Sequence, residues 1–212
     1  MPERVKQPLV VPTAPNQVWS IDFMQDRLVD GRKFRLLNII DDYNRESLAI
    51  EIDTSLPSLR VIRVLERLAA ERGYPANIRC DNGPEFISHL LEEWCSHEYR
   101  RINLQFIQPG KPMQNAYIER KNGSIRRELL NAYLFNSLAE VRIMAEEWRL
   151  DYNTERPHKS LGYLSPLQYA QVKKEQLALS TAASETLIKF EAPVVDKAVE
   201  SKKEIKLENS NS

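Results

Sequence analysis

The stretch VWSIDFMQDRLVDGRKFRLLNIIDDYNRESLAIEID, residues 18–53, contains three segments rich in β-branched, aromatic and leucine residues. The sequence DGR at 30–32 is typical of a hairpin turn, and an Asn-Arg turn separates the second segment from the third. The pattern therefore predicts three consecutive antiparallel strands, over 18–29, 33–43 and 46–53.

Helical and strand patterns alternate in the chain after residue 53. Apolar residues at helical spacing, closed by Gly73, predict a helix over 56–73. The further predicted elements are a strand over 74–80, a helix over 85–100, a strand over 103–108, and helices over 112–130 and 138–153. Three adjacent strands followed by this alternation predict an α/β fold of the ribonuclease H-like plan, a five-stranded mixed sheet flanked by helices.

The two ends of the chain differ from this core in composition. Residues 1–16 contain four prolines and no helical period, which predicts an extended linker. Residues 172–212 are polar, with balanced charge, and predict a tail that is disordered or partly helical. The chain is thus expected to consist of a linker, one core domain over 17–171 and a tail.

Composition excludes several classes of protein. The 212 residues carry 30 basic and 30 acidic side chains, so the net charge gives no argument for a nucleic-acid partner. No apolar stretch is long enough to cross a bilayer, and the first residues lack a signal-peptide pattern, which predicts a cytoplasmic protein without membrane contact. Cys80 and Cys95 form no CxxC pair and no zinc-site spacing, so both thiols are expected to be reduced and structural.

Asp81 stands in CDNGPEF, residues 80–86, between a predicted strand and residues that interrupt regular structure. Gly83 is expected to supply a positive φ, and Pro84 to begin a helical turn. In an open α/β sheet, catalytic groups collect at the carboxyl ends of strands. An isolated Asp-Asn-Gly is more often an Asx turn or a helix-entry acid, so other acids must decide between the two interpretations.

Asp22 and Glu119 are the other candidate acids. Asp22 lies in mid-strand on the face opposite its two neighbours, and it comes close to Asp81 where this topology places the first strand beside the fourth. Two such carboxylates repel each other unless one is protonated or a cation lies between them. Glu119 belongs to the long helix after the fifth strand, where Arg126, seven residues further on, points the same way.

Three carboxylates without a nearby histidine or cysteine suit a hard cation, Mg²⁺ or Mn²⁺, which takes its remaining ligands from water and substrate phosphates. Two such ions about 4 Å apart activate an attacking oxygen and stabilise the departing one during displacement at phosphorus. The residue types therefore favour metal-dependent phosphoryl chemistry.

Four motifs in order carry a family resemblance: VWSIDFM, CDNGPEF, QPGKPMQNAYIERKNGSIRREL and YNTERPHKSLGYLSP. Over this core the chain resembles the integrase-core (DDE) catalytic domain of bacterial insertion-sequence transposases, which is related to retroviral integrase. The resemblance implies that Asp22, Asp81 and Glu119 are the catalytic triad and the ligands of two Mg²⁺ or Mn²⁺ ions. It also implies that Arg126 is the family's basic, DNA-binding residue seven positions after the glutamate.

The resemblance further implies a reaction and partners. The family cleaves DNA at element ends and transfers the freed 3′-hydroxyl to target DNA, as a homo-oligomer when active. Beside a metal triad, Lys111, Arg120 and Lys121 are expected phosphate contacts. Family members carry a helix-turn-helix region ahead of the core, whereas this chain begins in the linker. We therefore expect a catalytic fragment, a second reading frame joined to an upstream helix-turn-helix partner, or a remnant.

Other interpretations stay open at this point. A catalytically silent DNA-binding or oligomerising remnant is one alternative, and a ribonuclease H-type nuclease that acts on hybrid RNA is another. Asp41 and Asp42 are expected to cap a turn. Tyr117, close to Glu119, fits either core packing or DNA contact, and RPHKSLGYLSP at 156–166 fits either a loop or a DNA contact.

Overall fold

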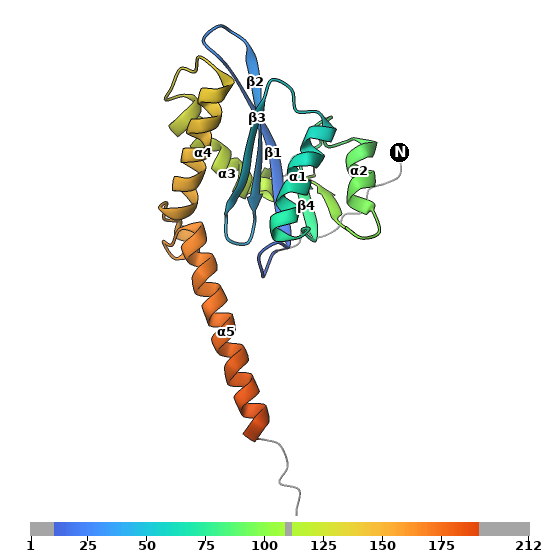
Figure 1. Ribbon diagram of the computed structural model, residues 1–212, viewed down its shortest axis with the longest axis vertical. Helices are drawn as coiled ribbons and strands as arrows, with labels where there is room; N and C mark the ends of the chain where they lie inside the picture. Colours follow the sequence, from blue (N-terminus) through green and yellow to red (C-terminus); the bar gives the residue numbers. More distant parts are fainter. Residues whose placement is uncertain (1–10, 109–111, 191–212) are drawn as a thin grey trace, which may run out of the picture. The chain divides into compact units, whose positions relative to one another are not determined.

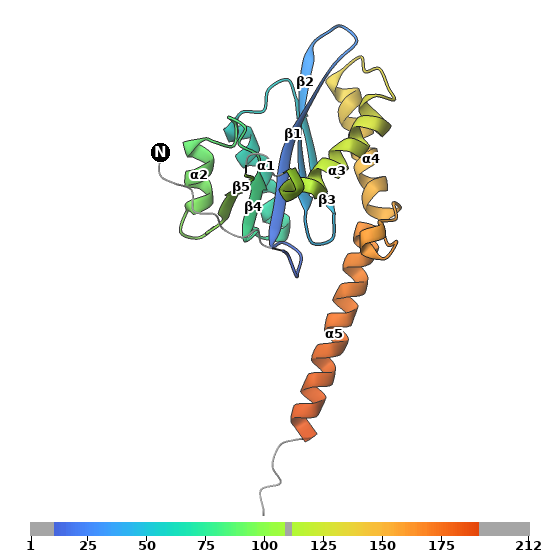
Figure 2. The same ribbon diagram turned by 180° about the vertical axis from the view of Figure 1, so that it is seen from behind.

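The computed structural model describes residues 11–108 and 112–190, and Figures 1 and 2 show it from two sides. Five strands form one sheet in the order β3-β2-β1-β4-β5. β1 pairs with β2 and β2 with β3 in antiparallel registers, whereas β4 is parallel to both β1 and β5. This confirms the predicted five-stranded mixed sheet. The strands are β1 (Val18–Arg27), β2 (Lys33–Asp41), β3 (Ser47–Asp53), β4 (Asn77–Cys80) and β5 (Asn103–Phe106).

Helices cover both faces of this sheet (Figure 1). Apolar residues at helical spacing give each helix a buried face, as Val61, Leu65 and Leu68 do for the first one. One face of the sheet carries α1 (Ser58–Arg72) and α2 (His89–Ser96), and the other carries α3 (Ala116–Ile125) and α4 (Leu138–Thr154).

Two apolar clusters fill the space between the sheet and these helices. Ile21 and Phe23 of β1 belong to the cluster under α1 and α2, whereas Met24 packs against the cluster under α3 and α4. Because side chains alternate between the faces of a strand, Asp22 emerges on the α3 side. The strand period thus places this acid opposite its two neighbours.

Two helices differ from their predicted ranges. The helix expected over 85–100 is limited to α2, because Ser88 caps its start by accepting a hydrogen bond from Leu91 N and His97 leaves the helical conformation with ψ of 139°. The helix expected over 112–130 consists of three pieces, which are a 3₁₀ turn at Pro112–Asn115, α3 itself, and a π-helical turn at Arg126–Leu130.

The C-terminal part of the described chain is helical up to residue 190. After a 3₁₀ turn at Lys159–Leu161, helix α5 runs over Pro166–Phe190. The chain divides into two compact units between Gln171 and Val172, and α5 begins in the first and continues in the second. Most of the predicted linker and the end of the predicted tail lie outside the described residues. In the described part, no helix has the length and apolar character needed to cross a membrane.

Candidate active site

β1 and β4 place two acids side by side at the centre of the sheet. The strands run parallel, with Ser20 opposite Arg79. Asp22 lies two residues beyond Ser20, in the middle of β1, and Asp81 lies two residues beyond Arg79, directly after β4 ends. The closeness of Asp22 and Asp81 therefore follows from the register of the two strands.

A chain of side-chain amides orients Asp22. Phe23 N donates a hydrogen bond to Asp22 Oδ1 at 2.8 Å, and Asn122 Nδ2 of α3 donates to Oδ2 at 2.7 Å. Asn122 Oδ1 accepts in turn from Asn38 Nδ2 of β2 at 2.9 Å, and both asparagines are buried. Each carboxylate oxygen of Asp22 thus has a donor, which fixes the orientation of the group.

The surroundings of Asp22 are rich in negative charge. The pKa of the Asp22 carboxyl is raised to about 6, chiefly by burial and also by the charges of Asp81 and Glu119. The hydrogen bonds from Phe23 and Asn122 lower this pKa in part, because they favour the ionised form. The negative charges of Asp81 and Glu119 therefore reach Asp22, and a cation beside this carboxylate would be favoured.

The loop after β4 holds Asp81 in a tight turn. Asp81 Oδ1 accepts a hydrogen bond from Gly83 N at 2.9 Å, and Asn82 Nδ2 donates to Ile107 O at 3.0 Å. A Cβ on Gly83 would lie only 2.9 Å from Asp81 Oδ1, so this close approach requires glycine. The positive φ expected at Gly83 is wrong, because this residue is not among those with positive φ. The lack of space for a Cβ atom, rather than the φ angle, explains why position 83 is a glycine.

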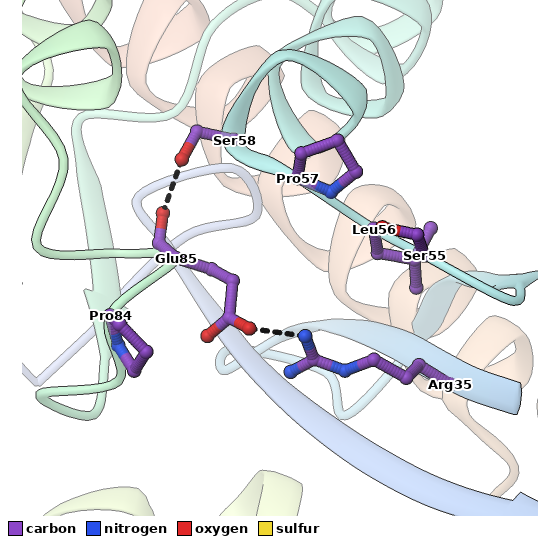
Figure 3. Close-up of a pocket in the computed structure, with 7 residues that line it drawn as sticks. All are labelled: Arg35, Ser55, Leu56, Pro57, Ser58, Pro84 and Glu85. Carbon is purple, nitrogen blue, oxygen red and sulfur yellow. Dashed lines mark hydrogen bonds and ion pairs between the residues drawn. The ribbon is translucent and has the colours of Figure 1, made fainter. Parts of the chain in front are cut away.

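Three contacts attach this loop to the sheet and to α1. Glu85 forms an ion pair with Arg35 of β2, and its carbonyl oxygen accepts from Ser58 Oγ at 2.9 Å (Figure 3). The ring of Phe86 stacks on that of Phe23, with centroids 4.8 Å apart. Since Phe23 follows the first acid directly, the stack connects the two acid-bearing segments.

α3 runs beside β1 and carries the third acid. Glu119 is exposed and lies one helical turn before Asn122, the residue that binds β1. At the end of the helix, Arg126 Nη1 donates to Asp26 Oδ2 at 2.7 Å and Nη2 donates to Gln25 O at 2.8 Å. The expected DNA ligand Arg126 is thus bound to β1 in this structure, with its side chain 36% exposed.

The other expected DNA contacts have different surroundings. Arg120 is exposed, and Lys111 lies outside the described residues. Lys121 is only 1% exposed, and its Nζ donates to Ile39 O at 3.3 Å. Burial lowers the pKa of Lys121 well below its usual value, and Arg149 adds to this shift. The prediction that Lys121 contacts DNA is therefore wrong, because its amine lies in the interior and not at the surface.

The candidate triad has the ligand types of a metal site, but its three side chains are not close enough together to form one. Over the described ranges, no three His, Cys, Asp or Glu side chains lie close enough together to hold a metal ion. The donors still fit Mg²⁺ or Mn²⁺, because carboxylate oxygens are the ligands these ions prefer. Burial is the main cause of the raised pKa of Asp22, and a bound cation would offset the smaller share that comes from the charges of Asp81 and Glu119.

Two family profiles match this chain, and both are described as Integrase core domain. One matches residues 12–112, which include Asp22 and Asp81, and the other matches residues 100–166, which include Glu119. The two matches together span residues 12–166, so the chain belongs to the integrase core family.

Curated relatives come from bacterial insertion elements. "Insertion element IS407 uncharacterized 31.7 kDa protein" of Burkholderia multivorans is 44% identical over 86% of this chain and 65% of its own length. "Insertion element IS476 uncharacterized 39.2 kDa protein" of Xanthomonas euvesicatoria is 42% identical over 82% of this chain and 49% of its own length. The chain thus spans less than two thirds of the length of one of these relatives and about half the length of the other.

A solved structure shares the fold. The HTLV-2 integrase catalytic core domain in complex with magnesium, in a trimeric form, superposes with a TM-score of 0.58 at 22% sequence identity. The match covers 74% of this chain and 98% of that one. The sheet and its helices therefore form the ribonuclease H-like fold of an integrase core, as predicted.

Proposed function

We propose that this chain is the catalytic core of a transposase, which cleaves DNA at the ends of an element and joins the freed 3′-hydroxyl to target DNA. The observation that carries the proposal is geometric: the register of β1 and β4 places Asp22 beside Asp81, and α3, which carries Glu119, binds Asp22 through Asn122. Membership of the integrase core family and the insertion-element origin of the relatives support it.

The proposed metal is Mg²⁺ or Mn²⁺, as one or two ions held by the carboxylates of Asp22, Asp81 and Glu119. Bound ions of this kind activate an attacking oxygen and stabilise the departing one during displacement at phosphorus. The solved integrase core in complex with magnesium supports this choice of cation. The role of Asn122 is to hold the Asp22 carboxylate in a fixed orientation before any ion arrives.

The proposed partners are DNA, further copies of this chain, and an upstream helix-turn-helix segment. DNA is the substrate, and Arg126 and Arg120 are the proposed phosphate contacts among the described residues. Assembly with further copies is supported by the trimeric form of the solved integrase core. A segment that recognises element ends agrees with the length of the relatives, which exceeds the part matched by this chain.

A plasmid-nicking assay with Mn²⁺ tests the proposal. We expect the wild-type chain to nick supercoiled DNA, and Asp22→Asn, Asp81→Asn and Glu119→Gln each to abolish nicking while DNA binding persists. The matched control is Asp30→Asn, because Asp30 is an exposed acid of the β1–β2 hairpin that pairs only with Arg32. Substantial nicking by any one triad variant would overturn the assignment of that acid.

One observation favours a second candidate, a catalytically silent DNA-binding remnant. The three acids of the triad are not grouped closely enough to hold a metal ion in this structure. If the remnant interpretation is right, the wild-type chain binds DNA without nicking it at any Mn²⁺ concentration, and the triad variants bind DNA as the wild type does. The nicking and binding assays together therefore separate the two candidates.

A further inference from the structure

The turn between β2 and β3 holds an arginine whose charge has no carboxylate partner in the described part of the chain. Arg45 adopts a positive φ of 63°, and its guanidinium carbon lies 3.3 Å from the centroid of the Tyr117 ring. Its Nη1 donates to Tyr43 O at 3.3 Å, whereas its Nε is buried without a hydrogen bond. Asp42, which attracts this charge, is itself bound to Arg79 at 2.7 Å.

A partly buried guanidinium in this state is unfavourable, because burial removes its hydration and the carboxylate that attracts it, Asp42, is already paired with Arg79. Burial accordingly lowers the pKa of Arg45, and the groups that oppose this shift, Tyr117 and Asp42 among them, compensate only in part. The planar guanidinium of an arginine of this kind is well suited to binding the anionic oxygens of a phosphate. The strained turn and the stacked ring fix the position of the guanidinium in advance.

Two further cations act on the same imidazole as Arg45. The pKa of His158 is lowered first by burial and then by the charges of Arg156, Arg45 and Arg120, so the charges of all three guanidinium groups reach His158. Arg156 is paired with Glu128, but Arg120 is exposed and has no ion pair with any described residue. The cations come from three places, the β2–β3 turn, α3, and the RPHKSLGYLSP loop at 156–166.

The position of this cluster indicates its ligand. Tyr117 is 40% exposed and lies on α3 two residues before Glu119, so the cluster borders the proposed catalytic acid. We propose that Arg45, Tyr117, Arg120 and Arg156 form a surface that binds the phosphate backbone of DNA beside the active site, with Arg45 as its central anion ligand. The identity of the anion as DNA rests on the proposed function.

Salt-dependent DNA binding tests this surface. The probe is a fluorescent DNA duplex of arbitrary sequence, and binding is followed by anisotropy in EDTA, so that metal chemistry does not contribute. The slope of the logarithm of the binding constant against the logarithm of the salt concentration counts the phosphate contacts. We expect its magnitude to fall by about 0.9 for Arg45→Met and by the same amount for Arg120→Ala, because each variant loses one phosphate contact. The affinity at low salt should fall about tenfold for each variant, and the double variant should combine both losses.

The matched control is Arg63→Ala, which removes the same charge from an exposed site on α1, over the other face of the sheet. We expect this control to bind as the wild type does, and circular dichroism melts to show that all variants are folded. A wild-type chain that does not bind the duplex, or Arg45→Met and Arg120→Ala variants that bind as tightly as Arg63→Ala, would overturn the proposal. Loss of self-association with unchanged DNA binding would assign the surface to contacts between copies instead.

Failure of this inference differs from failure of the proposed function. If the chain binds DNA through Arg45 but never nicks it, the proposed DNA-binding surface stands and the proposed transposase activity is wrong. If the chain nicks DNA with Mn²⁺ but its Arg45→Met variant keeps the salt slope and the affinity of the wild type, the activity stands and the proposed surface is wrong.

Discussion

Asp22 depends on a single side chain of α3 for its orientation. Asn122 both donates to Asp22 and accepts from Asn38, so it joins β1, β2 and α3 at one point in the interior. A hydrogen bond of this kind to a charged group is worth more than an ordinary one, and its loss also leaves the partner amide unpaired. Asn122 therefore matters both to the fold and to the candidate site.

Replacing Asn122 tests this double role. We expect Asn122→Ala to lower the free energy of unfolding by about 1–3 kcal/mol, because Asn38 Nδ2 and Asp22 Oδ2 lose their partner. Chemical denaturation measures the loss. Asn131→Ala is the control, since Asn131 is exposed after the π-helical turn and should tolerate substitution. Equal stability of the two variants would mean that the amide chain contributes nothing.

The two cysteines give a prediction about reactivity. Both are buried, and burial raises the pKa of the Cys95 thiol to about 12. Because the thiolate is the reactive form, raising the pH from neutral to about 9 should leave Cys95 almost wholly protonated. We expect neither thiol of the native chain to react with a water-soluble disulfide reagent over this range, and both to react in denaturant. Rapid labelling of the native protein would contradict the burial of Cys80 and Cys95.

At the scale of elements, two glycines illustrate opposite constraints. In the loop after β4, a Cβ on Gly83 would press against Asp81 Oδ1. On α3, a Cβ on Gly123 would meet only Arg127 Nη1 at 3.3 Å, and this is the far end of a flexible side chain. Glycine weakens a helix interior, so an alanine at position 123 can stabilise α3, whereas an alanine at position 83 cannot stabilise the loop.

The same alanine substitution should therefore act with opposite sign at these positions. We expect Gly123→Ala to stabilise the fold by about 0.5–1 kcal/mol. We expect Gly83→Ala to destabilise it by about 1–3 kcal/mol, because Asp81 must leave its turn to make room. Thermal melts of both variants measure the two effects. A stabilising Gly83→Ala would show that the turn around Asp81 is looser than the structure indicates.

The elements themselves were largely predictable from the sequence, because each depends on local patterns. Alternation, hairpin turns and helical spacing act over a few residues, and they placed the five strands and the main helices. The end of α2 was missed because the backbone leaves the helix at His97, where the composition still favours helix. Asp41 does cap a turn by accepting from Tyr43 N, whereas Asp42 instead pairs with the buried Arg79.

The supporting contacts of the site were not predictable, because they join residues far apart in the chain. Asn122 binds Asp22 across 100 residues and Asn38 across 84. The same limit explains the error at Lys121, since helical spacing alone did not show that this side of α3 packs against the sheet at Ile39. An asparagine one helical turn after Glu119 was the only local signal for the amide chain.

At the scale of the whole molecule, three distant segments converge near the centre of the sheet. Asp22, Asp81 and Glu119 lie in β1, after β4 and on α3, so the fold must form before the acids meet. The charges of Asp81 and Glu119 both act on Asp22, but the three acids are not grouped closely enough to hold a metal ion in the described structure. The central claim is that a divalent cation draws these three carboxylates into one site.

Calorimetric titration of Mn²⁺ into the purified chain tests this claim most directly, because it requires neither DNA nor turnover. We expect the wild type to bind Mn²⁺, and Asp22→Asn, Asp81→Asn and Glu119→Gln each to weaken binding by roughly tenfold or more. The control Asp30→Asn should bind as the wild type does. A wild-type chain that binds no Mn²⁺, or a triad variant that binds it as tightly as Asp30→Asn, would contradict a metal site shared by the three acids.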